Sequence, residues 1–129
     1  MALLERLLVL AQGTVRLLTL AADSPCAPDL CACAAAHGVK VLLGHQAGPT
    51  TSQLDACAAA GAVGFTHLGN GMPYTGDRHG NALVTALGYS SPSPSSSSSS
   101  PGLKYATIIC NGVHLPRHVI TAIRRSGMR

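Results

Sequence analysis

The chain has 129 residues and a mass of 13.1 kDa, the size of one ordinary domain, and its 47% of hydrophobic residues suffice for a core. Trp is absent and Phe occurs once, so the aromatic platforms on which proteins stack nucleic-acid bases are missing. The formal net charge of +4 reflects 9 Lys and Arg against 5 Asp and Glu, and much of it lies at Arg117, Arg124, Arg125 and Arg129. We attribute this charge to a basic helix end, which suits the helix dipole, and expect no nucleic-acid partner.

The N-terminal segment and the cysteines bear on location. Glu5 and Arg6 interrupt the first apolar run, which is far shorter than the ~20 residues of a membrane span. The five cysteines are odd in number and show no CxxC pairing; they are Cys26, Cys31, Cys33, Cys57 and Cys110. Such cysteines are typical of buried thiols in a reducing compartment. We therefore expect no signal peptide, no membrane insertion and a cytoplasmic location.

Helical and strand patterns alternate from the start of the chain. The spacing of apolar residues predicts a helix over Leu3–Ala11 and a strand over Thr14–Leu20. An alanine-rich segment predicts a helix over Asp29–His37 that ends at Gly38, and Val39–Leu43 reads as the next strand.

The alternation continues with Thr50 or Thr51 as the cap of a helix that stops at Gly61. The remaining predicted elements are helix Gln53–Ala60, strand Ala62–Thr66, helix Asn81–Leu87, strand Tyr105–Cys110 and helix Arg117–Arg125. Strands that are apolar on both faces and alternate with helices favour an α/β protein with a buried parallel sheet.

A low-complexity segment of serine and proline, Ser90–Gly102, lies between the fourth helix and the fourth strand. It has no apolar residue to bury, so we expect a disordered insertion (residues 90–102) without a specific role. A helix-to-strand connection lies at the edge of a parallel sheet opposite the strands' C-terminal ends, so the insertion should not obstruct a site there.

Three histidines occupy equivalent positions. His45, His67 and His114 each follow a predicted strand, and parallel strands bring their C-terminal ends together. Neutral imidazoles are good ligands for zinc and similar ions. A single histidine is more often a loop or core residue, but the shared position favours a site. The other histidines lack that position and are not assigned to the site; they are His37, His79 and His118.

The residues around these histidines suit a polar ligand. Gly44 precedes His45, and the segment 66–73 (THLGNGMP) places Asn70, a hydrogen-bonding residue, beside Gly71. Arg78 follows in a loop and is able to grip a phosphate through a two-pronged contact. A solvated loop arginine is the equally weighted alternative.

These segments resemble, in order, three motifs of N-acetylglucosamine-6-phosphate deacetylases. The segments are Gly44-His45, residues 66–80 (THLGNGMPYTGDRHG) and residues 111–114 (NGVH), and the upstream residues 15–23 (VRLLTLAAD) also match the family's pattern. The resemblance covers most of the chain. It implies that residues 1–129 form a partial (β/α)8 TIM barrel of the amidohydrolase superfamily, with about four βα units, and that the insertion lies within it.

The resemblance also implies a function. The family removes acetate from N-acetylglucosamine 6-phosphate in amino-sugar catabolism, with a divalent metal ion, zinc being the expected one, and as a homodimer. By resemblance, His45 and His67 are metal ligands, Asn70 and Gly71 line the substrate site, Arg78 binds the phosphate across the dimer interface, and His114 contacts the sugar and its acetamido group.

Several departures from the family pattern bear on activity. The family's glutamate ligand, on an earlier strand, and its catalytic aspartate, on a later strand, have no counterpart here, and Glu5 is the only glutamate. Gly71 stands where the family usually has Ala, and Asn111 where it has Asp. A catalytic zinc normally has three protein ligands and water. We therefore expect this chain to be a central fragment of a longer enzyme and to be inactive alone.

Other hypotheses stay open at this stage. The chain could be a non-catalytic half-barrel that keeps a sugar-phosphate or metal site as a binding or interaction module. A second alternative takes His45, His67 and His114 as a self-sufficient three-histidine metal site. A nucleic-acid binder has only the basic residues in its favour.

Overall fold

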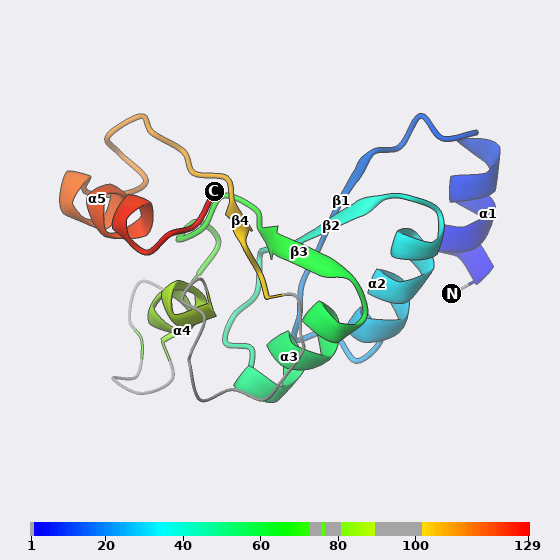
Figure 1. Ribbon diagram of the computed structural model, residues 1–129, viewed down its shortest axis with the longest axis horizontal. Coiled ribbons are helices and arrows are strands. Elements are labelled where there is room, and N and C mark those ends of the chain that lie inside the picture. Colours follow the sequence, from blue (N-terminus) through cyan, green and yellow to red (C-terminus); the bar gives the residue numbers. More distant parts are fainter. Residues whose placement is uncertain (1, 73–75, 77–80, 90–101) are drawn as a thin grey trace.

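The structure, a computed structural model, describes residues 2–72, 76, 81–89 and 102–129 (Figure 1). Helices and strands alternate along the chain. They are α1 (Ala2–Leu10), β1 (Leu17–Leu20), α2 (Ala27–Ala36), β2 (Lys40–Leu43), α3 (Thr51–Ala59), β3 (Ala62–Phe65), α4 (Ala82–Tyr89), β4 (Tyr105–Ala106) and α5 (Arg117–Arg125). Most of the expected insertion and the predicted phosphate ligand Arg78 lie outside the described residues.

The four strands form one parallel sheet in the order β1-β2-β3-β4. Leu17 pairs with Lys40, and Gly64 pairs with Tyr105, so each strand lies beside the next one along the chain. The register between β2 and β3 shifts between Val41 and Leu42. The α/β class with a parallel sheet is thus confirmed, and sequential βα units are consistent with a partial TIM barrel.

The local signals in the sequence explain where helices begin and end. Thr50 is the N-cap of α3: its hydroxyl accepts from the Gln53 N–H, while the Gln53 side chain accepts from the Thr50 N–H at 2.9 Å. This reciprocal pair satisfies two backbone donors that a helix start leaves free. Gly38 follows α2 with a φ of 73°, the left-handed conformation that glycine adopts without a side-chain clash.

The strand prediction for Tyr105–Cys110 is wrong in its length, because β4 ends at Ala106. The strand beside it, β3, ends at Phe65, and beyond that point the chain turns through His67. Residues after Ala106 therefore have no straight strand to pair with. Thr107 still donates its N–H to the Phe65 carbonyl at 3.0 Å, so contact between the two segments continues past β4.

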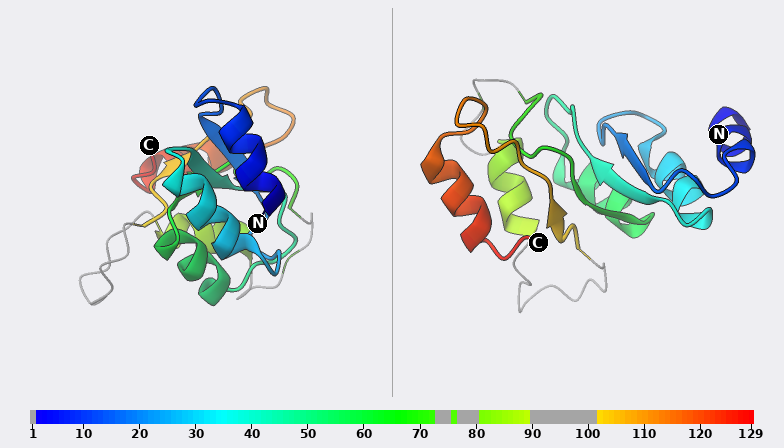
Figure 2. Two further views of the ribbon diagram at one scale, coloured as in Figure 1. Left: turned by 90° about the vertical axis from the view of Figure 1, so that its right-hand side faces the viewer. Right: turned by 90° about the horizontal axis from the view of Figure 1, so that it is seen from above.

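Helices α2 and α3 lie side by side on one face of the sheet, while α1 and α5 lie at opposite ends of the molecule (Figures 1 and 2). Helix α2 contacts α1, α3 and β2, and α3 contacts β3. The largest fully buried side chains of the core are Phe65, Leu43, Leu54, Leu68, Leu103, Gln46, Val41, Cys31 and Cys57. The core therefore lies between the sheet and the α2–α3 layer and extends along the strands.

The outer strands β1 and β4 each have one edge that is not paired with a further strand of the described residues. Leu17 on β1 is 54% exposed. On the other edge, Arg129 donates its N–H to the Lys104 carbonyl at 2.9 Å and accepts from the Ala106 N–H at 3.0 Å. Helix α1 also exposes large apolar side chains, among them Leu3, Leu7 and Leu10. Among the described helices, none has the length and apolar character that crossing a bilayer requires.

Candidate metal centre

His45 and His67 converge at the C-terminal ends of two neighbouring strands. His45 lies two residues after β2 and His67 two residues after β3. Their Nε2 atoms are 2.8 Å apart, and their rings meet edge to face with centroids 4.5 Å apart and an interplanar angle of 87°. Two histidines separated by 22 residues in the chain thus direct the same ring nitrogen to one point.

Both histidines adopt a left-handed backbone conformation, with φ of 56° at His45 and 32° at His67. Residues with a side chain rarely do so, and the cost is roughly 1–2 kcal/mol each. Such conformations persist only where the surrounding structure enforces them, and they are concentrated at functional sites. The turn after each strand is therefore held in place by its neighbours.

Gly44 permits a close approach beneath the first turn. The hydroxyl oxygens of Thr19 and Thr66 are 2.7 Å apart, although Thr19 lies on β1 and Thr66 directly follows β3, on either side of β2. A Cβ on Gly44 would lie 3.2 Å from the Thr66 Cβ and 3.4 Å from the Thr19 Cγ2. A glycine at this position lets the sheet curve so that the threonines meet across it.

A reciprocal pair of hydrogen bonds ties the loop after β1 to the segment that follows His45. The Ala22 N–H donates to the Gln46 Oε1 at 3.2 Å, and the Ala47 N–H donates to the Asp23 Oδ2 at 2.9 Å. Gln46 is 1% exposed, and its Nε2 has no hydrogen-bond partner among the described residues. This tie fixes the backbone immediately after His45.

The loop after His67 returns to the imidazole of His45. The Asn70 N–H donates to the His67 carbonyl at 2.8 Å, which closes the turn. Gly71 has a φ of 71°, and a Cβ there would lie 3.0 Å from the His45 Nδ1. Asn70 and Gly71, which the sequence motif assigns to the substrate site, therefore border the two histidines.

His114 does not join the two histidines as a third ligand. Its Nδ1 lies 3.0 Å from the Asn111 Oδ1, which also accepts from the backbone N–H groups of Val113 and His114. Within residues 2–72, 76, 81–89 and 102–129, no group of three or more His, Cys, Asp or Glu side chains is placed to hold a metal ion. The hypothesis of a self-sufficient three-histidine site is therefore wrong for the part of the chain that the structure describes.

The two imidazoles fit part of a metal coordination sphere. A tetrahedral zinc ion at about 2.0–2.1 Å from each nitrogen separates the two by about 3.3 Å, so the present pair would open by about half an ångström. The bond at 2.8 Å requires a proton on one Nε2, and a metal would take the place of that proton. The Nδ1 of His67 is buried, and none of the described residues supplies the acceptor that commonly orients a metal-binding imidazole.

Two cysteine thiols are buried in the core. Cys31 and Cys57 are buried between α2 and α3, and burial raises the pKa of the Cys31 thiol to about 12, with the Cys57 thiol adding to the effect. Burial likewise raises the pKa of Cys57, partly offset by its hydrogen bond from Cys31. A thiol that stays protonated is a poor nucleophile and metal ligand, so these cysteines are packing residues.

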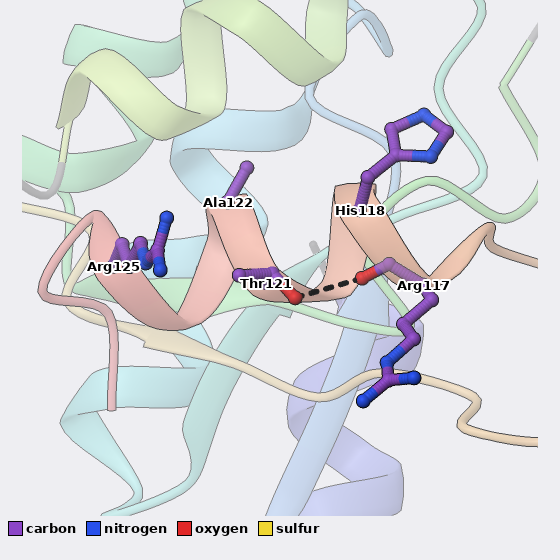
Figure 3. Close-up of a pocket in the computed structure, with 5 residues that line it drawn as sticks. All are labelled: Arg117, His118, Thr121, Ala122 and Arg125. Carbon is purple, nitrogen blue, oxygen red and sulfur yellow. Dashed lines mark hydrogen bonds between the residues drawn. The ribbon is translucent and has the colours of Figure 1, made fainter.

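A hollow of about 600 Å³ lies along α5 (Figure 3). Its lining residues all belong to this helix: Arg117, His118, Thr121, Ala122 and Arg125. The Thr121 hydroxyl is occupied, because it donates to the Arg117 carbonyl at 2.9 Å. Neither imidazole of the histidine pair lines this hollow, so it is separate from the candidate metal centre.

Sequence reasoning missed three residues that hold the histidines in place: Thr107, Asp23 and Gln46. Thr107 accepts the His67 N–H on its hydroxyl at 2.7 Å. Asp23 follows a strand, as the histidines do, and that position was its available signal. Thr107 lay inside the predicted strand Tyr105–Cys110, so its place after β4 became visible only in the structure. Gln46 carried no signal of its own beyond its place next to His45.

Comparison with known proteins finds similar solved structures, among them the following three. No protein-family model matches the chain, and no curated protein matches it in sequence. The N-acetyl-D-glucosamine-6-phosphate deacetylase of Mycobacterium smegmatis matches with a TM-score of 0.76 and 27% identity over 96% of this chain and 29% of its own. A mutant of that enzyme in complex with N-acetyl-D-glucosamine-6-phosphate matches with a TM-score of 0.75 and 27% identity, over 95% of this chain.

The third match is the N-acetylglucosamine-6-phosphate deacetylase of Pasteurella multocida, with a TM-score of 0.59 and 27% identity over 85% of this chain and 25% of its own. The chain thus spans less than a third of the length of each of these enzymes. The resemblance found in the motifs is confirmed by the structure: the chain has the fold of one section of an N-acetylglucosamine-6-phosphate deacetylase, an enzyme of the amidohydrolase family.

Proposed function

We propose that this chain forms the section of an N-acetylglucosamine-6-phosphate deacetylase that supplies two histidine ligands and part of the sugar site. The proposed reaction is metal-dependent hydrolysis of N-acetylglucosamine 6-phosphate to glucosamine 6-phosphate and acetate. The observation that carries the proposal is the 2.8 Å separation of the Nε2 atoms of His45 and His67 at the C-terminal ends of β2 and β3. Active sites of βα barrels are built at that end of the strands.

Two histidines are the metal ligands in this proposal, and zinc is the ion that suits them best. A bound divalent ion lowers the pKa of a water ligand and so supplies hydroxide near neutral pH. His45 and His67 hold their imidazoles toward one point, and the exposed position of His45 leaves room for water beside them. A third protein ligand is needed for a catalytic site. Glu5, the only glutamate, is exposed on α1 and does not provide it.

The substrate side of the proposal uses residues beside the metal pair. Asn70 and Gly71 border His45 and His67, so a sugar bound there would lie next to the ion. The His114 Nδ1 is engaged with Asn111, which leaves its Nε2 to meet the acetamido group. Arg78 is proposed to bind the 6-phosphate across a homodimer interface, as the family resemblance implies. We place the protein in the cytoplasm, because its five cysteines are free.

Zinc titration of the purified chain tests the metal pair. We expect zinc to bind and His45→Ala and His67→Ala each to weaken binding by at least about tenfold, since each removes a ligand. His118→Ala, an exposed histidine on α5, is the matched control and should bind as the wild type does. Binding that is equal in all four proteins, or absent in the wild type at millimolar zinc, would falsify the proposal.

A non-catalytic binding module is the second candidate, and the absence of a three-ligand group among the described residues favours it. Acetate release from N-acetylglucosamine 6-phosphate distinguishes the two when it is measured beside binding of that sugar phosphate. Binding without acetate release by the chain, together with release once the missing ligand and aspartate are supplied by a longer protein, supports the deacetylase section. Binding without release in both proteins supports the module.

A further inference from the structure

The backbone of His67 is held by a residue that directly follows the neighbouring strand β4. With a φ of 32°, His67 occupies a conformation that a residue with a side chain adopts only under constraint. This backbone conformation matters, because the turn at His67 directs its Nε2 at the Nε2 of His45.

Thr107, which directly follows β4, makes three hydrogen bonds around this turn. Its hydroxyl oxygen accepts from the His67 N–H at 2.7 Å. Its carbonyl accepts from the Leu68 N–H at 2.8 Å, and its own N–H donates to the Phe65 carbonyl at 3.0 Å. The residues before, at and after the turn are thus bound to one residue that lies 40 positions away from His67 in the chain.

Only one of these bonds depends on the side chain of residue 107. The two backbone bonds would survive any substitution that keeps the main chain in place, since every residue other than proline offers the same N–H and carbonyl. The His67 N–H, in contrast, loses its acceptor when the hydroxyl is removed. A strained backbone conformation persists only where its surroundings enforce it, so loss of this bond favours a rearrangement of the turn.

We propose that Thr107 is a positioning residue for the metal centre, whose hydroxyl fixes the His67 turn and thereby keeps its imidazole directed at His45. The metal-binding part of this inference rests on the proposed function of the histidine pair. The placement of the rings does not, because it is a property of the metal-free chain. Groups that bond the ring of a metal-binding histidine typically account for about 10- to 100-fold in metal affinity, and we expect an effect of the same order from the bond that sets the backbone of His67.

The test compares Thr107→Val, which keeps the shape but removes the acceptor, with Thr107→Ser, which keeps the hydroxyl. Thr121→Val is the matched control, because it removes a threonine hydroxyl bond on α5, outside the histidine pair. In the metal-free proteins, nuclear Overhauser contacts between the two imidazoles report ring placement. In zinc titrations, the dissociation constant reports the metal site.

We expect Thr107→Val to lose the ring-to-ring contacts and to bind zinc about 10- to 100-fold more weakly, with Thr107→Ser and Thr121→Val close to wild type. Unchanged contacts in Thr107→Val, or a Thr107→Ser variant as impaired as Thr107→Val, would overturn the inference. If the wild type does not bind zinc, the proposed function fails while the ring contacts still decide the role of Thr107. If Thr107→Val does not fold, Thr107→Ala replaces it with the same expected outcomes.

Discussion

Thr19 lies on β1 and Thr66 directly follows β3, two strands that are not neighbours, yet their hydroxyl oxygens are 2.7 Å apart. Adjacent strands lie about 4.8 Å apart, so two threonines can meet across a middle strand only where the sheet curves toward the face on which they lie. The residue between them is Gly44, which has no side chain to keep them apart. The curvature that brings the strand ends together is therefore visible one residue before His45.

Gly44→Ala should destabilise the chain. The added Cβ would lie 3.2 Å from the Thr66 Cβ and 3.3 Å from the Thr66 carbonyl oxygen, and overpacking of this kind costs about 1–3 kcal/mol in the free energy of unfolding. Urea denaturation measures it. Gly48→Ala is the control, because a Cβ at Gly48 meets nothing within 4 Å, and it should stay within about 0.5 kcal/mol of wild type. Equal stability of the two variants would contradict the close approach.

Gly71→Ala should weaken zinc binding as well as stability, although it introduces the residue that the family motif usually has. The left-handed φ of Gly71 costs a residue with a side chain roughly 1–2 kcal/mol, and the new Cβ would press on the His45 imidazole from 3.0 Å. Zinc titration and urea denaturation of the same sample separate the two effects.

The matched glycine for this comparison is Gly88 in α4, where a Cβ meets nothing within 4 Å. Gly88→Ala should stabilise the chain by about 0.5–1 kcal/mol through helix propensity and leave zinc binding unchanged. A Gly71→Ala variant with wild-type zinc affinity would show that the loop does not press on His45.

Thr50→Ala should cost about 1 kcal/mol of stability, because it removes the hydroxyl that accepts the Gln53 N–H at the start of α3. Thermal or urea denaturation measures the loss. Thr51→Ala is the control: Thr51 is the first residue of α3 itself, and alanine suits that position. A larger loss of stability in Thr51→Ala than in Thr50→Ala would show that Thr51, and not Thr50, caps the helix.

Stability should fall as pH rises above about 9. Burial raises the pKa of Cys31 from 9.0 to about 12, so the folded chain keeps this proton after the unfolded chain has lost it. The resulting stabilisation is complete below pH 9 and is lost as pH rises toward 12, with a slope of up to about 1.4 kcal/mol per pH unit for one thiol.

The measurement is the free energy of unfolding of the reduced chain between about pH 8 and about pH 11, a range that brackets the ordinary thiol pKa. Cys31→Ala should show a shallower decline than wild type. Ala34→Gly, a buried change on the same helix that removes no ionisable group, should lower stability but keep the wild-type slope. Identical slopes in all three proteins would show that the Cys31 thiol ionises alike in both states.

The sequence predicted the alternation of helices and strands because its signals are local. Apolar periodicity, the Thr50–Gln53 capping box and the glycine after α2 each act within a few residues, and each appears in the structure near the expected position. The length of β4 escaped prediction because it depends on where its partner β3 ends, which the apolar segment Tyr105–Cys110 does not encode.

The convergence of His45 and His67 also followed from the sequence, since parallel strands align their C-terminal ends. Only the tertiary structure decided how that convergence is held. Thr107 lies 40 residues from His67, Gln46 lies 24 residues from Ala22, and Thr19 lies 47 residues from Thr66. Hydrogen bonds over such separations form only after the chain has folded, because sequence patterns record the spacing of neighbours and not the distance between side chains on different strands.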